Sequence, residues 1–424
     1  MTTVTVLKPP QGGTVAAIAS KSHAHRALIA AAVADSPTEI ACAETNEDIL
    51  ATVRCLQALG ADIAVHPGMI AVSPLPRPLR AGQRTLDCGE SGSTLRFMLP
   101  VACALGANAC FLMRARLPKR PLSPLYEQLA AHGCALSAQG VSPLTVSGSL
   151  RGGRYTVAGN VSSQYVTGLL LALPLLSDDS ELQITGELES RPYVELTLQT
   201  LRGFGVAIPR RDDGFFIRGG QPFRSPGTLS IEGDWSNAAC WLAAGALGTQ
   251  AVTVTGLAAQ SPQGDKAFLD ILARFGAKVR RTETSVTVSG GTLTGVTADA
   301  RDIPDLVPMI AAVALAARGE THIHHAERLR LKESDRLRVI AETLRSFGAE
   351  IAQTPDGLRI TGGRPLHGAQ IDAAEDHRIV MMAAVASALC EGKVTIRGAD
   401  AVHKSYPRFF ADFRTLGGVA REDV

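Results

Sequence analysis

The pattern of apolar and polar positions along the 424 residues repeats six times. Each repeat has an amphipathic helical stretch, a Gly, a short alternating segment, a turn and a second alternating segment. The six glycines recur at intervals of 69 to 73 residues: Gly60, Gly133, Gly205, Gly276, Gly348 and Gly417. Gly suits a helix C-terminus because it adopts the left-handed conformation, and strict alternation is typical of a half-buried strand. Each repeat therefore predicts a helix that leads into a β-hairpin.

Turn sequences support three of these hairpins: HPG at 66–68, DDG at 212–214 and PDG at 355–357. Six such units predict an α/β protein with internal duplication. Their period exceeds the 20–50 residues typical of solenoids, which favours compact domains of several units.

Two domains are also expected from length, because a single hydrophobic core stops growing at roughly 250–300 residues. Six units divide into three and three, and the Pro- and Gly-containing segment 224–236 interrupts the pattern after the third. We place a boundary near Gly233. On its pattern alone, the opening segment TVTVLKPP could belong to either half.

Composition narrows the class of partner. Hydrophobic residues make up 46% of the chain and aromatic residues only 4%, so the core must be mainly aliphatic. A formal net charge of +2 provides no general attraction to nucleic acid or membrane. The longest apolar stretch, 169–176, is broken by Pro174, and the N-terminus lacks a run long enough for a signal peptide. We expect a cytoplasmic protein.

Metal and disulfide chemistry is not favoured by the sequence. The eight Cys form no C-x-x-C pair and mostly have aliphatic neighbours, which favours buried free thiols. The HIHH segment at 322–325 suggests a metal site at first, but no matching carboxylate or Cys cluster accompanies it. We interpret these histidines as part of a strand or loop.

Candidate anion sites lie where predicted helices begin. Segments starting at Ser20, Gly89, Val161 and Glu375 combine hydroxyl groups with cations, namely Lys21, Arg26, Arg96 and Arg378. A helix N-terminus carries about +0.5 charge, so such cations are unfavourable unless an anion binds there. Free N–H groups, hydroxyls and cations together predict phosphate or carboxylate binding.

The segment LKESDR (331–336) is the strongest of these signals. Lys332 and Arg336 have the spacing of neighbours on one helix face, where a bound dianion would offset their repulsion. Glu333 could be an ion-pair partner of Arg336 or a proton donor. Asp305, before an apolar helix, could be a helix cap or a functional carboxylate.

Nine motifs occur in an order that resembles the 5-enolpyruvylshikimate-3-phosphate synthase family. They are KSHAHR (21–26), GESGSTLR (89–96), KRP (119–121), SSQ (162–164), SRPY (190–193), IPD (303–305), LKESDR (331–336), DHR (376–378) and KSYP (404–407). The resemblance implies two similar domains, each of three βαβαββ repeats, in the inside-out α/β barrel of the enolpyruvyl transferases. It implies a discontinuous domain of residues 1–19 plus 233–424, a second domain of residues 20–232, and an active site in the cleft between them.

The resemblance also implies an activity. A shikimate-pathway transferase of chorismate and aromatic amino-acid biosynthesis would move the enolpyruvyl group of phosphoenolpyruvate to the 5-hydroxyl of shikimate 3-phosphate. No cofactor and no metal are expected, the two substrates are the only partners, and the chain is expected to be a monomer. Asp305 would be the base, and Glu333 or Lys21 the acid.

Substrate contacts follow by the same resemblance. Those of shikimate 3-phosphate fall on Lys21, Ser22, Arg26, Ser162, Ser163, Gln164, Ser190, Asp305 and Lys332. Those of phosphoenolpyruvate fall on Lys21, Gly92, Arg120, Arg336, Arg378 and Lys404, with Arg96, His377 and Tyr193 as further candidates. The chain departs from the family pattern at Glu90 and Arg328, which are therefore left out of the site.

Three other classes of protein fit the sequence less well. The sister enzymes that act on UDP-N-acetylglucosamine typically open the first helix with Lys-Asn and carry a loop Cys, whereas this chain has Lys21-Ser22 and no Cys in 112–121. An RNA 3′-phosphate cyclase would require a more basic surface. A non-catalytic binding relative would be expected to lack an acid or base, and Asp305, Glu333 and Lys21 are all present.

Overall fold

A computed structural model describes residues 2–423, and its internal contacts divide the chain into two units. Unit 1 comprises Met1–Ile18 with Glu232–Val424, and unit 2 comprises Ala19–Ile231. Three of the six repeat glycines lie in each unit.

Unit 2 contains three four-stranded sheets with the same order of strand directions. The first two strands are parallel, and the last two complete an antiparallel arrangement. The sheets are β14 (Thr228–Ser230), β3 (Thr38–Ala41), β5 (Met69–Ser73) and β4 (Asp62–His66); β6 (Arg84–Asp87), β7 (Ala109–Leu112), β9 (Leu144–Gly148) and β8 (Cys134–Leu136); and β10 (Gly153–Ala158), β11 (Ser180–Thr185), β13 (Gly214–Ile217) and β12 (Arg210–Arg211).

Unit 1 repeats this arrangement three times. Its sheets are β2 (Gly13–Ala16), β15 (Val252–Thr255), β17 (Ser285–Ser289) and β16 (Lys278–Arg281); β18 (Thr297–Asp299), β19 (Glu320–His324), β21 (Gly357–Thr361) and β20 (Glu350–Thr354); and β23 (Gln370–Asp372), β25 (Val394–Arg397), β1 (Thr3–Lys8) and β26 (Val419–Asp423). A small pair, β22 (Leu366–His367) and β24 (Cys390–Glu391), lies outside this scheme.

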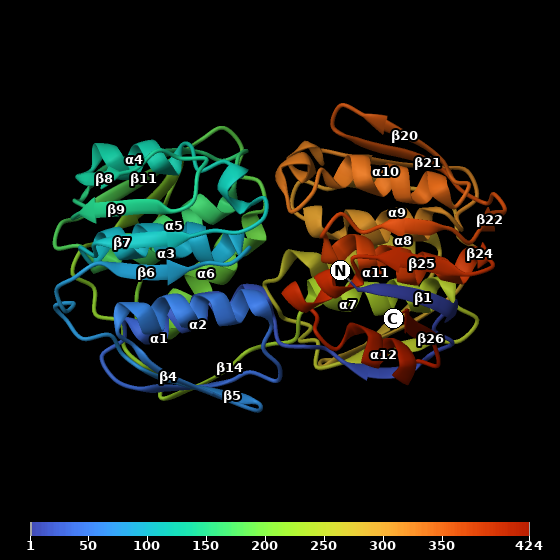
Figure 1. The fold of residues 1–424 in the computed structure, drawn as a ribbon, viewed down its shortest axis with the longest axis horizontal. Coiled ribbons are helices and arrows are strands. Elements are labelled where there is room, and N and C mark those ends of the chain that lie inside the picture. Colours follow the sequence, from blue (N-terminus) through green and yellow to red (C-terminus); the bar gives the residue numbers. More distant parts are fainter. Residues whose placement is uncertain (1, 424) are drawn as a thin grey trace. The chain divides into compact units, whose positions relative to one another are not determined.

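The last sheet of unit 1 is built from both ends of the chain. Strand β26 follows the sixth helix of the repeat pattern and takes the place of the first hairpin strand, while β1 takes the place of the second. Figure 1 shows β1, in blue, beside the red strands β25 and β26. The opening segment therefore belongs to unit 1.

Six outer helices precede the repeat glycines: α2 (Glu47–Leu59), α4 (Leu125–Ala131), α6 (Arg191–Gly203), α8 (Phe268–Phe275), α10 (Arg336–Ser346) and α12 (Phe409–Thr415). All six glycines have a positive φ, between 78° at Gly205 and 113° at Gly60. The three turns expected at 66–68, 212–214 and 355–357 join β4 to β5, β12 to β13 and β20 to β21. The helix-then-hairpin prediction is confirmed.

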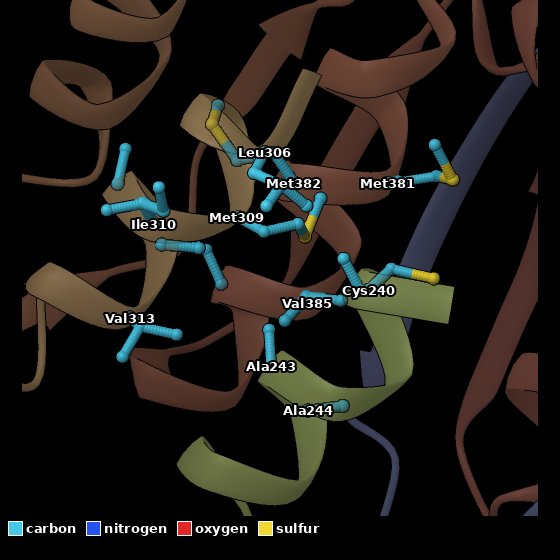
Figure 2. Packing of buried hydrophobic residues seen from close by; sticks show 14 of the residues in the cluster. Cys240, Ala243, Ala244, Leu306, Met309, Ile310, Val313, Met381, Met382 and Val385 are labelled. Atoms are coloured by element: carbon cyan, nitrogen blue, oxygen red, sulfur yellow. The ribbon is translucent and has the colours of Figure 1, made fainter. Parts of the chain in front are cut away.

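Six central helices are buried along nearly their whole length. Unit 2 has α1 (Lys21–Ala32), α3 (Gly92–Ala104) and α5 (Ser163–Ala172), and unit 1 has α7 (Trp235–Leu247), α9 (Val307–Ala314) and α11 (His377–Ala386). Figure 2 shows aliphatic and Met side chains of α7, α9 and α11 packed together, among them Met309, Met382 and Val385. The central helices thus form the aliphatic cores that the composition predicts.

The state of the cysteines agrees with the expectation of free thiols that are mostly buried. All eight cysteines are free thiols, and six of them are buried. Among residues 2–423, no helix has the length and hydropathy that crossing a lipid bilayer requires.

Candidate active site

The candidate residues of unit 2 gather where the central helices begin. Ser20, Ser91 and Ser162 cap α1, α3 and α5, and each serine oxygen accepts a hydrogen bond from a backbone N–H of the first turn. None of these three helices has an acidic residue in its first turn. Their N-terminal partial charges are therefore not neutralised by acidic side chains of that turn, which favours anion binding. We give the name unit 2 half-site to the candidate residues of this unit: Lys21, Ser22, Arg26, Gly92, Arg96, Arg120, Ser162, Ser163, Gln164, Ser190 and Tyr193.

Lys21, the first residue of α1, forms an ion pair with Asp48 of α2. Its Nζ lies 2.8 Å from Asp48 Oδ2. The backbone oxygen of Asp48 in turn accepts a hydrogen bond of 3.3 Å from Thr94 Oγ1, in the first turn of α3. Lys21 is thus linked through Asp48 to the start of α3, which lies within the GESGSTLR motif. Ser22 lies beside it and uses its backbone oxygen to accept a hydrogen bond from Arg26.

Arg26 is 2% exposed and bridges three helices. Its guanidinium donates to Thr197 Oγ1 at 2.8 Å, to the Tyr193 backbone oxygen at 3.0 Å and to Thr167 Oγ1 at 3.3 Å. Burial lowers the pKa of Arg26 to about 9, partly offset by Tyr193, so it keeps its charge at neutral pH. These partners are neutral oxygens, which leave a net positive charge beneath the start of α1.

Two guanidinium groups meet at Gly92. A Cβ atom there would lie 2.7 Å from Arg96 Nη1 and 2.8 Å from Arg120 Nη1. Arg96 Nη1 also donates to Gln164 Oε1 at 2.8 Å, and Gln164 Nε2 donates to Ser93 Oγ at 2.9 Å. The structure therefore brings Gly92, Arg96, Arg120 and Gln164 into one cluster.

The remaining unit 2 candidates lie on α5 and α6. Ser162 caps α5, and Ser163 is its buried first residue. Ser190 precedes α6 with a φ of 54°, a left-handed conformation that is uncommon for serine. Tyr193 contributes its backbone oxygen, to which Arg26 donates a hydrogen bond.

In unit 1, one buried guanidinium organises the candidate residues. Arg336 is 1% exposed and lies 2.7 Å from Asp305 Oδ1, 2.7 Å from Glu333 Oε2 and 2.8 Å from Asp376 Oδ2. Burial lowers the pKa of Arg336, but these carboxylates outweigh it and raise the pKa above its ordinary value. We call Asp305, Lys332, Glu333, Arg336, Arg378 and Lys404 the unit 1 half-site.

One expectation for this segment is wrong. Lys332 and Arg336 do not share a helix face, because α10 begins only at Arg336 and Lys332 has an extended backbone. The Asp335 side chain caps α10 by accepting from Arg338 N at 3.2 Å, which fixes the helix start there. Both cations nevertheless reach the same carboxylate, since Lys332 Nζ lies 3.6 Å from Asp305 Oδ1.

Asp305 lies in a short 3-10 helix, Pro304–Leu306, and the N-cap positions of this helix and of α9 are held by Ile303 and Leu306, so Asp305 is not a helix cap. Burial alone raises the pKa of Asp305, but Lys332 and the two arginines outweigh burial and hold the pKa well below its ordinary value. Burial lowers the pKa of Lys332, and Asp305 opposes that shift. Asp305 is therefore a carboxylate at neutral pH.

Arg378 and Lys404 are held at the start of α11. Arg378 donates to the backbone oxygen of Ser236 at 2.7 Å and to its Oγ at 2.6 Å. Lys404 Nζ donates to the Glu375 backbone oxygen at 2.7 Å, and Glu375 has a φ of 56°. His377, the first residue of α11, is 3% exposed.

Three residues outside the predicted site hold it in place: Asp48 pairs with Lys21, Asp376 with Arg336, and Ser236 with Arg378. Asp376 is fully buried and also caps α11 through Arg378 N at 3.0 Å. In the sequence it looks like an ordinary helix cap, and Asp48 an ordinary first-turn acid. Only the pairing of segments 40 residues apart reveals the role of Asp376.

The two half-sites differ in chemistry. The unit 2 half-site offers helix N-termini, hydroxyls and cations, which suit phosphate and carboxylate groups. The unit 1 half-site adds Asp305 and Glu333, carboxyl groups that can accept or donate a proton beside an anion.

Comparisons with known proteins agree on one family. The sequence model of the protein family EPSP synthase (3-phosphoshikimate 1-carboxyvinyltransferase) matches residues 8–413. The 3-phosphoshikimate 1-carboxyvinyltransferase of Clostridium perfringens strain SM101 is 40% identical over 414 residues, 97% of each chain. The enzyme of that name from Methanocaldococcus jannaschii is 36% identical, over 96% of each chain.

Solved structures show the same fold. The EPSP synthase of Acinetobacter baumannii superposes with a TM-score of 0.84 at 23% identity, over 100% of both chains. The enolpyruvyl transferase NikO of Streptomyces tendae superposes with a TM-score of 0.80 at 20% identity, over 100% of this chain and 99% of that chain. The predicted fold class, the α/β fold of the enolpyruvyl transferases, is confirmed.

Proposed function

Because the chain belongs to the EPSP synthase family, we propose that it transfers the enolpyruvyl group of phosphoenolpyruvate to the 5-hydroxyl of shikimate 3-phosphate and releases phosphate. The observation that carries this proposal is the family match across residues 8–413, which includes both half-sites. The reaction belongs to the shikimate pathway, which leads to chorismate and the aromatic amino acids.

The residue types support this chemistry. The substrate hydroxyl oxygen attacks C2 of phosphoenolpyruvate and loses its proton, while the methylene carbon C3 gains one. The tetrahedral intermediate then loses phosphate and a proton from the new methyl group. Both substrates are anions, so helix N-termini and cations can bind them and stabilise the charge that develops.

Asp305 is the proposed base for the hydroxyl proton. Its neighbours keep it ionised, which is the required state, although they also make it a weak base. A bound dianion would reduce the effect of Lys332 and Arg336 on Asp305 and thereby raise its pKa towards a useful value. Glu333, hydrogen-bonded to Arg336, is the proposed acid for C3. Lys21 is the rival donor.

We further propose that the half-sites form one active site in a cleft between two domains, residues 1–19 plus 233–424 and residues 20–232. The base, the proposed acid and four cations are in unit 1, whereas Lys21 and the Gly92 cluster are in unit 2. Neither set alone offers both the proton-transfer groups and the full complement of anion contacts. Closure of the two domains around the substrates would also exclude water from the reacting atoms.

Phosphate release from the purified chain tests the proposal. Turnover should require both phosphoenolpyruvate and shikimate 3-phosphate and should persist after dialysis against a chelator, because the proposed steps use only side chains. UDP-N-acetylglucosamine replaces shikimate 3-phosphate in a parallel reaction. Turnover with that acceptor alone, or with neither acceptor, would refute the proposed substrate.

A further inference from the structure

A group of three polar side chains lies in unit 1 outside the half-site. Strands β18 and β19 are parallel, and their register places Asp299 directly beside His324 at the end of both strands. Directly paired residues on neighbouring strands point to the same face of a sheet. The segment 322–325 was expected to lack a matching carboxylate, and Asp299 shows that this expectation is wrong.

His325 completes the group through an unusual backbone conformation. Consecutive residues of a strand normally point to opposite faces, which would separate His324 from His325. His325 instead has a φ of 54°, and the two rings lie 4.5 Å apart with an interplanar angle of 66°. Their Nδ1 atoms are 3.1 Å apart. Left-handed backbone at a non-glycine residue occurs often at ligand sites.

Two of the three separations in the group match those between neighbouring ligands of a single metal ion. His325 Nδ1 lies 3.1 Å from Asp299 Oδ2, and one ligand atom from each of the three residues lies within 4.8 Å of the others. Two ligands at about 2.1 Å from an ion are about 3.0 Å apart at right angles and about 3.4 Å apart in a tetrahedron. We propose that Asp299, His324 and His325 bind a divalent transition-metal ion such as Zn²⁺ or Ni²⁺, which favours imidazole and carboxylate ligands.

The surrounding charges are mixed. Arg301 Nη2 is 3.1 Å from Nδ1 and 3.3 Å from Nε2 of His325. A nitrogen nearly equidistant from both ring nitrogens lies off the in-plane lone-pair direction of each, so the lone pairs can still reach a metal. Asp356 adds a second carboxylate beside the group and accepts a hydrogen bond from His325 N at 3.2 Å. The side chains of His325 and Asp299 are 40% and 49% exposed, which gives an ion access and leaves room for water ligands.

This site is separate from the proposed reaction. None of its three residues belongs to either half-site, so a chelator should remove the ion without preventing turnover. Strand β18 leads towards Asp305, and His325 precedes the segment that carries Lys332. Substitutions in these segments can therefore change turnover without any effect on an ion. For this reason ion binding is measured directly rather than through activity.

Calorimetric titration of tag-free, chelator-treated full-length protein with Zn²⁺ tests the proposal, and Co²⁺ absorbance reports the coordination. We expect one ion per chain, and affinity at least about tenfold lower in His324→Ala and in Asp299→Asn. His322→Ala is the matched control, because His322 lies on the same strand with its ring 5.5 Å from that of His324 and outside the group. It should bind Zn²⁺ like the unaltered protein.

Thermal unfolding provides a second readout, since an ion that binds the folded state should raise the Tm of the unaltered protein and of His322→Ala only. Three results would overturn the proposal: no binding at zinc concentrations up to about 100 µM, unchanged affinity in both ligand variants, or an equal loss in His322→Ala.

Discussion

Arg26, in the second turn of α1, and Arg336, the first residue of α10, are both buried arginines, but their neighbours give them different roles. Arg336 is surrounded by three carboxylates, so its charge is compensated within unit 1. Arg26 donates to hydroxyl and carbonyl oxygens and keeps its charge available to an anion. Both read alike in the sequence, as cations near an expected helix start, because the compensating residues lie in other segments.

Lys21 offers the most direct test at the residue scale. Lys21→Met removes a charge-assisted contact worth roughly 1.5–3 kcal/mol, so kcat/KM should fall at least about tenfold. Lys278→Met, at an exposed position on β16, serves as the control and should retain normal kinetics. Because the Lys21 variant also leaves Asp48 without its ion pair, its Tm is measured alongside. Near-normal kcat/KM in a folded variant would contradict the anion-binding role of α1.

His23 predicts a pH-dependent stability. Burial, followed by the charge of Arg26, lowers its pKa from 6.5 to about 4. Between these values the unfolded chain binds a proton that the folded chain does not, so the free energy of unfolding should decrease as pH falls from 6.5 to 4. The contribution of His23 is up to about 3 kcal/mol, and His23→Gln should flatten the pH profile by that amount.

Urea unfolding at several pH values measures this change. His66→Gln, on exposed β4, is the control and should reproduce the profile of the unaltered protein. The same steep loss of stability in His23→Gln would show that another group is responsible.

At the scale of elements, helix ends were the most predictable feature. Serine, aspartate and glycine signals act within one turn, so the starts of α1 and α11 and the repeat glycines could be identified locally. The prediction that Lys332 and Arg336 share a helix face was wrong because the LKESDR segment holds several polar residues that suit a helix cap. The choice of Asp335 depends on Arg336 reaching three carboxylates, two of them in distant segments. The spacing of Lys332 and Arg336 could not reveal this.

The start of α3 provides a prediction for one element. In Gly92→Ala the new methyl group would overlap Arg96 and Arg120, whose guanidinium groups lie at the ends of flexible side chains and can move. Stability should therefore change by less than about 1 kcal/mol, while KM for phosphoenolpyruvate should rise several-fold as the cluster opens.

Gly203→Ala provides the comparison, because a Cβ atom at that helical position meets nothing within 4 Å. It should leave KM unchanged and, if anything, stabilise α6, since Ala is the better helix former. Equal KM values in both variants would argue against an anion site at Gly92.

At the scale of the whole molecule, the six-fold repeat was visible in the sequence but the sheet partners were not. The parallel neighbour of β3 is β14, and that of β2 is β15, each more than a hundred residues away. Local periodicity carries no information about such pairings, because any strand of suitable length and polarity fits the pattern. The ion-pairing roles of Asp48 and Asp376 could not be predicted from the sequence for a related reason, since their partners are distant in the chain.

Domain closure is the prediction at this scale. If the substrates bind cations of both units, they should favour the closed arrangement by the difference between their affinities for closed and open forms. Small-angle scattering should then show a smaller radius of gyration with shikimate 3-phosphate plus an unreactive phosphoenolpyruvate mimic. In the Lys21→Met variant, the same ligands should decrease the radius of gyration less. An unchanged radius at saturating ligand, in active protein, would favour a preformed pocket.

The sheet shared by β1 and β26 has a consequence for synthesis on the ribosome. Unit 2 is one continuous segment and can fold while the rest of the chain is still being translated. Strand β1 emerges before unit 2, yet both of its neighbours, β25 and β26, emerge only after unit 2. It must therefore wait, with its hydrogen-bonding edges open, for more than 380 residues of translation. We expect β1 to be a binding segment for chaperones during that time, and a slowed ribosome to prolong its exposure to wrong partners.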